Sequence, residues 1–328
     1  MSGTWRNFGW QADEVPREPL DETTRQAKDL PRTLTRVPGR DVTQRPVFEP
    51  ALKHYRNAYR ATDPVFTDPA RGVAWRAARQ RAQHLVLGGI AASPWADALV
   101  LRGSVLLSAW FGEAAREPGD LDFVVVPASW RIDEERTERM FAGVAEAAEA
   151  AEAQGNEVRF HPRTAVVEDI WTYDRVPGRR MVLPWSAPGL PGGHVQLDFV
   201  FNEPLPEEPE RLELPGGAVL LAATPALSLV WKLMWLLTDV HGQGKDLYDA
   251  VLLAEDHPLS CELLHEVFRL SGEWPYPYRQ KILLEDVVEA AGEVEWNHFV
   301  TEYPQFAGRE REFADRLVRA VAPAFPED

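Results

Sequence analysis

One stretch, residues 101–126, constrains the fold of this chain more than any other, because it alternates short apolar segments with polar turns. An apolar strand is predicted over residues 98–102, followed by a turn at Gly103-Ser104 and a short apolar helix over residues 105–111. A polar loop then leads into a second apolar strand, which begins at Asp120. Strand, turn, helix and strand in this order predict an α+β fold.

Asp120 and Asp122 are the first candidates for chemistry in this stretch. Side chains alternate along a strand, so the two carboxylates point to the same face, roughly 7 Å apart. Paired carboxylates suit Mg²⁺ or Mn²⁺, and a pair of metal ions is the usual clamp for phosphoryl chemistry. Gly103 lets the backbone approach a ligand closely, and Ser104 begins a helix whose N–H groups and dipole favour a phosphate. Asp198, inside the apolar strand of residues 194–201, is the candidate third carboxylate.

Each of these features also has a purely structural interpretation. A Gly-Ser pair before a helix is usually a turn and a cap, and Asp-x-Asp at the start of a strand is usually a solvated strand end. Here the features occur in order, on the elements where they are needed, and an aspartate in a third strand accompanies them. This combination favours a metal site over three unrelated structural roles.

The composition limits the class of protein. A chain of 328 residues that is 45% hydrophobic can bury a large core, which suggests two domains or one domain with a large appendage. The single cysteine, Cys261, excludes an internal disulfide and is typical of a reducing cytoplasm. We expect no signal peptide in residues 1–30 and no membrane span, since the most apolar run, residues 218–237, contains Pro225 and Lys232. The net charge of −16 argues against a broad basic surface and leaves a local basic patch open.

The chain is predicted to have three parts: an extended N-terminal arm over residues 1–70, a core over residues 71–211 and a helical C-terminal domain over residues 212–328. The arm is rich in Pro, Arg, Asp and Thr, and one short helix is expected in it near residues 51–61. The arm is either disordered or wraps the body with its aromatic side chains as anchors. A Pro/Glu-rich stretch over residues 203–211 is interpreted as a boundary without a buried pattern.

The core is predicted to combine helices with strands. A helix is expected over residues 73–91, where three arginines are interpreted as a solvated face, with phosphate binding as the less favoured alternative: Arg76, Arg79 and Arg81. A crossover helix with an apolar stripe is expected before Gly155. Short strands are expected over residues 156–161, 165–173 and 179–185, two of them joined as a hairpin around Pro177-Gly178.

Lys232 is an unusual residue in its surroundings. The helix that begins at Thr224-Pro225 is apolar nearly all round and should be buried. A buried ammonium needs a partner, which is either a carboxylate of a neighbouring helix or the triphosphate of a ligand, and the sequence alone leaves both open. Lys245 and Asp246 open the next helix, with Asp249 three residues further on the same face.

Several common catalytic patterns are missing from the sequence. The eight histidines include no pair with i, i+4 spacing, and the chain has no G-x-S-x-G elbow, no G-x-x-x-x-G-K-[ST] loop and no G-x-G-x-x-G after a strand. Zinc chemistry and a Ser/His/Asp hydrolase therefore have no support.

Together these motifs resemble the AbiEii/AbiGii type of nucleotidyltransferase, within the superfamily that has the polymerase-beta-type fold. The resemblance covers roughly residues 98–255 and rests on Gly103-Ser104, on Arg116 with Asp120-Leu121-Asp122, on Lys232, and on Lys245-Asp246-Leu247-Tyr248-Asp249. Two departures concern the substrate more than the fold. Pro118 stands where the family usually has a serine, and the arm of residues 1–60 does not match the family's compact N-terminus.

The resemblance implies a mixed sheet with flanking helices, followed by a helical C-terminal domain. It also implies a cytoplasmic enzyme that moves a nucleoside monophosphate from an NTP onto an acceptor hydroxyl. Family members include toxins of toxin–antitoxin and phage-defence systems, some of which modify the acceptor end of tRNA. A cognate antitoxin is then an expected partner.

The roles that follow are hypotheses. Asp120, Asp122 and Asp198 are expected to hold Mg²⁺ or Mn²⁺, with Asp198 on the side of the acceptor hydroxyl. Gly103, Ser104, Lys232 and Lys245 are expected to bind phosphates, and Asp246 or Asp249 to orient a lysine or contact the nucleotide. Two alternatives remain: a nucleotidyltransferase that modifies a small molecule, which the acidity mildly favours, and a catalytically silent nucleotide-binding module of the same fold.

Overall fold

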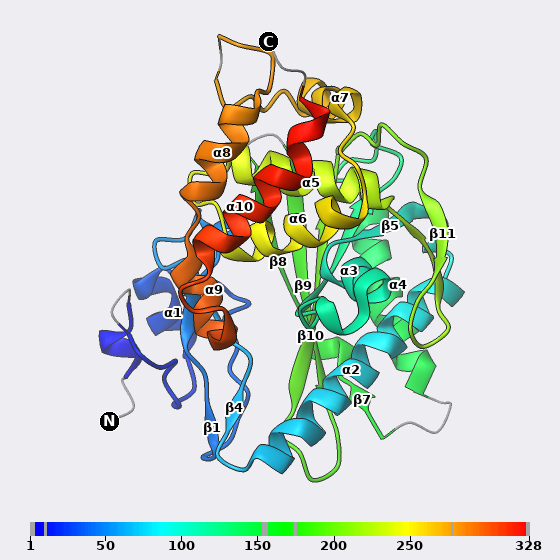
Figure 1. Cartoon of the computed structure of the whole chain (residues 1–328). Coiled ribbons are helices and arrows are strands. Elements are labelled where there is room, and N and C mark those ends of the chain that lie inside the picture. Colours follow the sequence, from blue (N-terminus) through cyan, green and yellow to red (C-terminus); the bar gives the residue numbers. More distant parts are fainter. Residues whose placement is uncertain (1–3, 10–11, 153–156, 174–175, 277, 326–328) are drawn as a thin grey trace. The chain divides into compact units, whose positions relative to one another are not determined.

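The computed structural model describes residues 4–9, 12–152, 157–173, 176–276 and 278–325 (Figure 1). The chain divides into two compact units, and each is described by itself. Unit 1 comprises Met1–Val100, Gly119–Asn202 and Leu212–Leu221, and unit 2 comprises Leu101–Pro118, Glu203–Arg211 and Ala222–Asp328. The predicted functional division at residues 70 and 211 stays a prediction.

The main sheet of the protein is mixed, as predicted. Its strands follow the order β11-β12-β5-β6-β10-β9-β7, and β8 also pairs with β9. Strands β6 and β10 are parallel, whereas β9 runs antiparallel to β7, β8 and β10. The strands are β5 (Leu99–Arg102), β6 (Asp120–Val125), β7 (Arg159–Phe160), β8 (Val166–Tyr173), β9 (Val176–Ser186), β10 (Gly193–Val200), β11 (Glu210–Glu213) and β12 (Val219–Ala222). The chain passes from one unit to the other within β5, β11 and β12.

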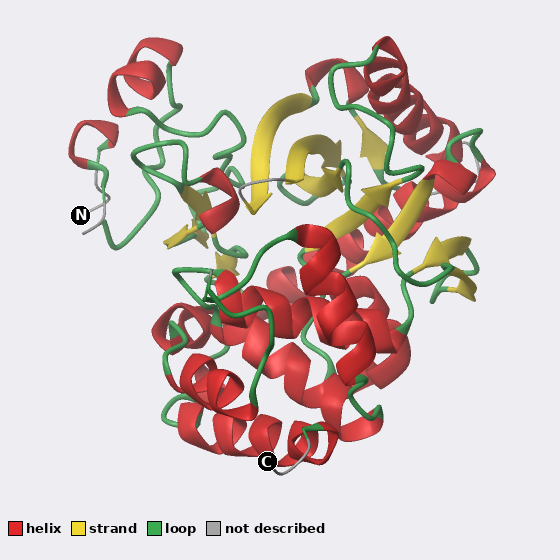
Figure 2. Cartoon of the chain, turned by 90° about the horizontal axis from the view of Figure 1, so that it is seen from above, coloured by secondary structure: helices red, strands yellow, loops and turns green. Residues whose placement is uncertain are grey.

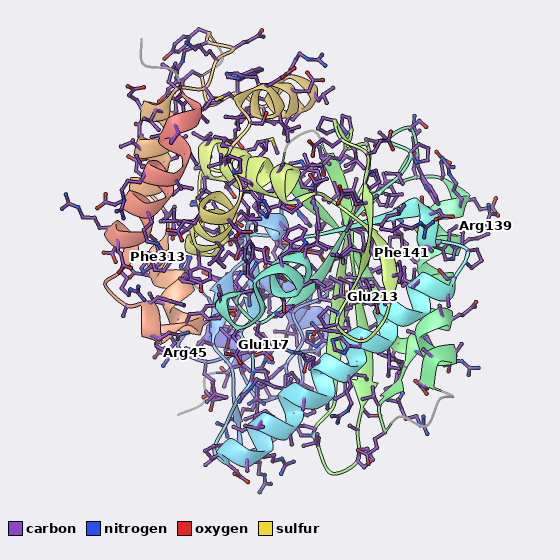
Figure 3. The ribbon with its side chains drawn as sticks, turned by 45° about the vertical axis from the view of Figure 1, so that its right-hand side comes forward. Arg45, Glu117, Arg139, Phe141, Glu213 and Phe313 are labelled. Atoms are coloured by element: carbon purple, nitrogen blue, oxygen red, sulfur yellow. The ribbon has the colours of Figure 1, made fainter. Side chains whose placement is uncertain are left out.

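Two long helices of unit 1, α2 (Pro69–Ala92) and α4 (Glu135–Ala151), pack against each other (Figure 1). Their backbones approach closely at Gly89, where a Cβ atom would lie 2.7 Å from the carbonyl oxygen of Ala147. Helix α4 is amphipathic: Phe141 is buried, whereas the Arg139 side chain is 59% exposed (Figure 3). The crossover helix is therefore confirmed.

The alternation of side chains gives the sheet two different faces. On one face, Phe123 of β6 and Phe199 of β10 stack with ring centroids 5.6 Å apart, and Phe141 of α4 meets Phe199 edge-on at 5.1 Å. Asp122 and Asp198 precede these phenylalanines by one position and therefore point to the opposite face. One strand pattern thus buries an apolar core and presents carboxylates on the other side.

The N-terminal segment, residues 4–66 as far as they are described, is part of unit 1. It contains α1 (Glu22–Lys28) and two small antiparallel pairs, β1 (Val42–Thr43) with β4 (Val65–Phe66) and β2 (Pro46–Phe48) with β3 (Tyr59–Ala61). The helix predicted near residues 51–61 is wrong. The chain forms a single 3-10 turn, Pro50–Leu52, and then enters β3, whose main-chain hydrogen bonds to β2 replace helical ones.

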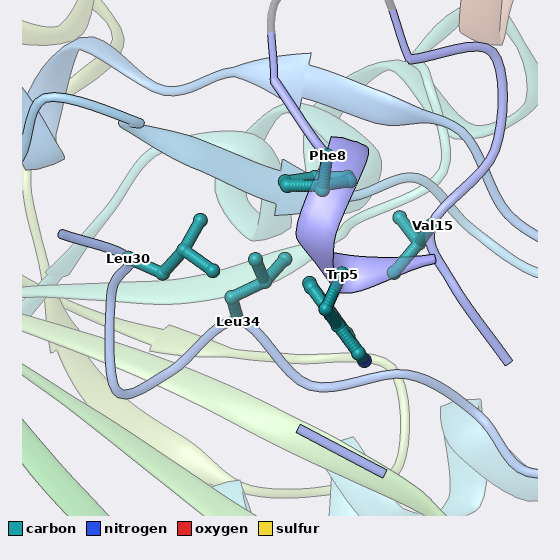
Figure 4. Packing of buried hydrophobic residues seen from close by; sticks show 5 residues of the cluster. All are labelled: Trp5, Phe8, Val15, Leu30 and Leu34. Carbon is teal, nitrogen blue, oxygen red and sulfur yellow. The ribbon is translucent and has the colours of Figure 1, made fainter. Parts of the chain in front are cut away.

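Aromatic and aliphatic side chains anchor this segment, which was one of the two predicted alternatives. Figure 4 shows a small core of its own, made of Trp5, Phe8, Val15, Leu30 and Leu34. A second cluster joins Leu52 and Ala58 of the segment to Ile170 of β8. Its packing on the sheet explains how a stretch with little periodicity becomes ordered.

The predicted basic helix is confirmed as α2, but the predicted exposure of one of its arginines is wrong. Arg76 and Arg81 are exposed as expected. Arg79 is buried, lies over the ring of Trp75 at 5.6 Å and pairs with Asp63. The interpretation of Arg79 as part of a solvated face is wrong, because a carboxylate from the N-terminal segment reaches it.

The predicted hairpin also needs one correction. Strands β8 and β9 form the antiparallel pair, but Pro177 and Gly178 lie inside β9, opposite Trp171 and Ile170. A glycine is required there, since a Cβ atom would lie 2.9 Å from the Ile170 side chain and 3.0 Å from the carbonyl oxygen of Phe199.

Unit 2 is mainly helical, and Figure 2 shows the helices that lead to the C-terminus gathered into one group. Its helices are α3 (Ser104–Phe111), α5 (Pro225–Thr238), α6 (Gly244–Asp256), α7 (Cys261–Ser271), α8 (Leu284–Gly292), α9 (Trp296–Glu302) and α10 (Glu310–Val321). Thr224 caps α5 by accepting a hydrogen bond from the Leu227 N–H, as predicted. Helices α6, α9 and α10 share an aromatic core that includes Tyr248, Phe299 and Phe313. Figure 3 shows Phe313 on α10. Within the described part of the chain, no helix has both the length and the apolar character that a membrane crossing needs.

Candidate active site

The three predicted metal ligands lie together on one face of the sheet in unit 1. Asp122 and Asp198 are direct neighbours in the parallel register of β6 and β10, and Asp120 lies two residues before Asp122 on the same face. One carboxylate oxygen from each residue lies within 4.8 Å of the others. Asp120 and Asp122 are half-buried, and Asp198 is buried. This acidic cluster, Asp120, Asp122 and Asp198, is the candidate metal site.

Arg180 of β9 is a part of this site that the sequence interpretation missed. Its Nε and Nη2 donate to the two oxygens of Asp198 at 2.8 and 2.7 Å, and Nη2 lies 3.7 Å from Glu49 Oε1. Burial acts to lower the pKa of Arg180, but the carboxylates of Asp198 and Glu49 outweigh it and hold that pKa above its usual value. Arg180 therefore stays charged and fixes the Asp198 side chain.

The strand registers extend this contact into a row of charged residues across the sheet. Asp122 lies opposite Asp198, Asp198 opposite Arg180, and Arg180 opposite Glu168. Glu168 in turn accepts hydrogen bonds from the N-terminal segment: the N–H groups of residues 32 and 33 at 2.8 and 3.0 Å, and the hydroxyl of Tyr55 at 2.9 Å. The N-terminal segment is thus bonded to the same row that carries the aspartates.

The residues of the acidic cluster fit a divalent cation. Carboxylate oxygens are the ligands that Mg²⁺ and Mn²⁺ prefer. Asp120, Asp122 and Asp198 bring three negative charges, of which the Arg180 guanidinium compensates one. Each carboxylate has about four lone-pair sites, so Asp198 can accept hydrogen bonds from Arg180 and ligate a metal ion at the same time.

Gly103 and Ser104 open helix α3 in unit 2. Gly103 has φ +79° and ψ −152° and is the N-cap of the helix, a conformation that favours glycine. Ser104 is the first helical residue and is buried. The first N–H groups of a helix lack partners within the helix, so this turn has the chemistry of an anion site. Its nucleotide-binding role stays a prediction.

Lys232 lies in a buried ionic network of unit 2. Its Nζ is 2.7 Å from Asp246 Oδ1 and 2.9 Å from Asp249 Oδ2, and 4.8 Å from the ring centre of Trp235. Asp249 also accepts three hydrogen bonds from Arg116, at 3.0, 3.2 and 2.9 Å. Of the two partners that the sequence left open, the structure contains the carboxylate of a neighbouring helix.

This network shifts the pKa values of Lys232 and Asp249. Burial acts to lower the pKa of Lys232, but Asp246 and Asp249 outweigh it and raise that pKa. Burial acts to raise the pKa of Asp249, but Arg116 and Lys232 hold it below its usual value. Lys232 and Asp249 are therefore both charged near neutral pH. Lys245 is half-buried and forms no ion pair among the described residues.

A second buried ion pair of unit 2 corrects the interpretation of residues 203–211. Glu203 is buried and lies 2.6 Å from Arg102, whose guanidinium is 5.3 Å from the ring centres of both Trp231 and Trp235. The expectation of no buried pattern there is wrong for Glu203. The Pro/Glu-rich composition did not indicate that Glu203 would be buried in an ion pair with Arg102, at the end of β5.

The comparison with protein families agrees with the class of protein that these motifs indicate. Residues 85–321 match the model of the family described as nucleotidyl transferase AbiEii toxin, type IV toxin–antitoxin system. Because this match covers more than half of the chain, the chain belongs to the AbiEii family, and it is a nucleotidyltransferase. The resemblance drawn from the motifs is confirmed.

One solved structure with a similar fold is MenT4, a nucleotidyltransferase toxin from Mycobacterium tuberculosis H37Rv. The two chains share 18% sequence identity with a TM-score of 0.47, and the match covers 78% of this chain and 99% of that chain. No curated protein matches the chain.

Proposed function

We propose that the protein transfers a nucleoside monophosphate from an NTP to an acceptor hydroxyl in a reaction that requires Mg²⁺ or Mn²⁺. The observation that carries this proposal is the acidic cluster, in which Asp120, Asp122 and Asp198 bring carboxylate oxygens within 4.8 Å of one another on one sheet face. Such a cluster suits the binding of metal ions that clamp a triphosphate.

In unit 1, Asp120 and Asp122 would hold the metal, and Asp198 would serve the acceptor side. A bound divalent cation supplies positive charge against the triphosphate and the attacking oxygen. Asp198 is held in one orientation by Arg180, at 2.7 and 2.8 Å, so it is preorganised to accept the proton of the acceptor hydroxyl or to order that hydroxyl.

In unit 2, the Gly103 turn and Ser104 would bind phosphate oxygens, through the N–H groups at the start of α3 and the serine hydroxyl. Lys232 and Lys245 would neutralise charge on the leaving pyrophosphate. Asp246 and Asp249 hold Lys232 at 2.7 and 2.9 Å, and this contact supports their role in orienting the lysine.

For the acceptor we propose RNA, and tRNA in particular, and for the partner a cognate antitoxin, with the cytoplasm as the site of action. The family description as a toxin of type IV toxin–antitoxin systems supports these choices. The net charge of −16 favours a small-molecule acceptor instead, so this alternative belongs in the same test.

The test is a transfer assay. The protein is incubated with Mg²⁺ and each α-labelled NTP in turn, with either total tRNA or a metabolite extract as the acceptor. We expect label in one acceptor pool with the native protein and none with Asp120→Asn. Asp133→Asn is the matched control, because Asp133 is 64% exposed and lies outside the acidic cluster. Equal transfer by Asp120→Asn and the native protein would contradict the proposal, and so would the absence of label in both pools.

A further inference from the structure

A pocket lies in the N-terminal segment, largely before the residues that match the family model. Its volume is about 570 Å³, and all of its lining residues except Val166 precede residue 85. Six of its fifteen lining residues are charged: Arg17, Glu18, Glu22, Arg25, Arg32 and Arg36. Four arginines against two glutamates form a local excess of positive charge on a chain whose net charge is −16. We call it the arginine pocket.

The backbone of residues 32–36 fixes one wall of this pocket. Thr33 donates its N–H and its hydroxyl to Glu168 of β8, and Thr35 Oγ1 lies 3.2 Å from His194 Nδ1 of β10. Arg32, Leu34, Thr35 and Arg36 line the pocket. Thr33 and Thr35 therefore bond this segment to the sheet, and Arg32 and Arg36 place guanidinium groups in the pocket wall.

Two of the four arginines are largely neutralised by carboxylates. Arg25 makes two hydrogen bonds to Glu22, at 2.8 and 2.7 Å, and Arg17 makes one to Glu14 at 3.1 Å. Such pairs leave little net field in the pocket. The remaining positive charge has to come from the other two arginines.

Arg32 and Arg36 supply that charge. Arg32 is exposed, and its guanidinium has one long contact, 3.4 Å to the carbonyl oxygen of Val167. The Arg36 side chain is 10% exposed, and the carboxylate of Glu14 is 3.9 Å away. Arg36 Nη2 donates to the carbonyl oxygen of Val42 at 2.6 Å, and within the described part of the chain the buried Nε has no hydrogen-bond partner. Burial, and then the charge of Arg17, lower the pKa of Arg36.

We propose that the arginine pocket binds a phosphate group of a ligand, either a phosphodiester of RNA or the phosphate of a free nucleotide. Guanidinium groups match phosphate oxygens in geometry and charge, and an anion between Arg32 and Arg36 would compensate both. Binding here does not require the transfer reaction, so the proposal stands apart from the proposed function.

The strand registers relate one wall of the pocket to the acidic cluster. Glu168, which holds residues 32 and 33, is two strands away from Asp198, and neighbouring strands are about 4.8 Å apart. The backbones at Glu168 and Asp198 are therefore roughly 10 Å apart.

The experiment measures binding without metal, in EDTA, so that its failure and a failure of the transfer reaction remain distinguishable. Fluorescence anisotropy follows a labelled single-stranded RNA, and AMP serves as the competitor. Arg32→Gln is the main variant because Arg32 is exposed, so the fold should be preserved. Arg45→Gln is the matched control: it removes the same charge from an exposed arginine of the same segment that does not line the pocket (Figure 3).

We expect Arg32→Gln to weaken RNA binding at least fivefold and to reduce the salt dependence by about one phosphate contact, while Arg45→Gln stays within twofold of the native protein. Competition by AMP would assign the pocket to a nucleotide phosphate, and the lack of competition to the RNA backbone. Arg36→Gln should have the same effect as Arg32→Gln, with circular dichroism as the check on folding. Equal binding by the native protein and Arg32→Gln, equal losses in Arg32→Gln and Arg45→Gln, or no binding of RNA or AMP by the native protein would overturn the proposal.

Discussion

Replacing Lys232 by methionine should destabilise unit 2 strongly. Methionine keeps most of the aliphatic stem and its packing, so the change isolates the loss of the ammonium. Asp246 then loses the cation that lies 2.7 Å away, whereas Asp249 keeps Arg116 at 2.9 Å. Breaking a buried ion pair from one side costs roughly 3–5 kcal/mol of folding free energy. Protonation of the stranded carboxyl group limits the loss, since neutralising an ordinary carboxylate at pH 7 costs roughly 4 kcal/mol.

The assay for this prediction is thermal and denaturant unfolding followed by circular dichroism. A loss of 3–5 kcal/mol corresponds to a fall in Tm of roughly 6–20 °C for a unit of this size. The loss should shrink as the pH falls toward 4, because protonation removes the stranded charge. The double variant Lys232→Met/Asp246→Asn should recover at least half of the stability. Lys245→Met is the control, and its change should stay within about 1 kcal/mol.

A Lys232→Met protein as stable as the native one would refute this reasoning. It would mean that the contacts with Asp246 and Asp249 contribute little to folding, and that Lys232 is retained for the triphosphate alone. A measurement of NTP affinity on the same variant separates the two roles, because loss of a phosphate contact lowers affinity without lowering Tm.

Three further predictions concern Asp198, His194 and Glu203. Asp198→Asn should lower the transfer rate by roughly 10²–10⁴-fold and leave the NTP Kd within about threefold of the native value. A large loss of NTP affinity with an unchanged transfer rate would contradict the acceptor-side role of Asp198. Burial, and then the charge of Arg79, lower the pKa of His194 to about 4. Unfolding therefore takes up a proton between pH 6.5 and 4. The free energy of unfolding should fall by roughly 2–3 kcal/mol as the pH drops through this window. The His194→Gln protein should lack this pH dependence when Tm is measured over a series of pH values. Glu203→Gln should cost roughly 3–5 kcal/mol in urea unfolding, because it removes the carboxylate charge that lies 2.6 Å from the buried Arg102; an unchanged midpoint would show that the pair is dispensable.

The sequence predicted those parts of the fold that depend on local periodicity. The strand alternation around Asp120 and Asp122 placed both carboxylates on one face, and the apolar strand around Asp198 indicated a third. Thr224 with Pro225 marked the start of α5, since a cap and a fixed proline φ are local signals. These features need no knowledge of distant contacts.

The rest depends on which distant residues meet. Arg180 reaches Asp198 only through the register of β9 against β10, and a strand pattern does not specify that register. An arginine inside the apolar run of residues 179–185, beside a strand with an aspartate, is the signal that could have led to this pair. For Lys232 the sequence showed the need for a partner but not its identity. The N-terminal segment has little periodicity, and its order comes from tertiary packing and from Glu168.

The most direct test of the account is a titration of Mn²⁺ into the NTP-bound protein, followed by electron paramagnetic resonance of the free ion. We expect saturable binding by the native protein. We expect at least a tenfold weaker affinity in the double variant Asp120→Asn/Asp122→Asn, with an unchanged or higher Tm, because the carboxylates of the acidic cluster repel one another without metal. Equal Mn²⁺ affinity in both proteins would contradict the assignment of the acidic cluster as the metal site of this nucleotidyltransferase.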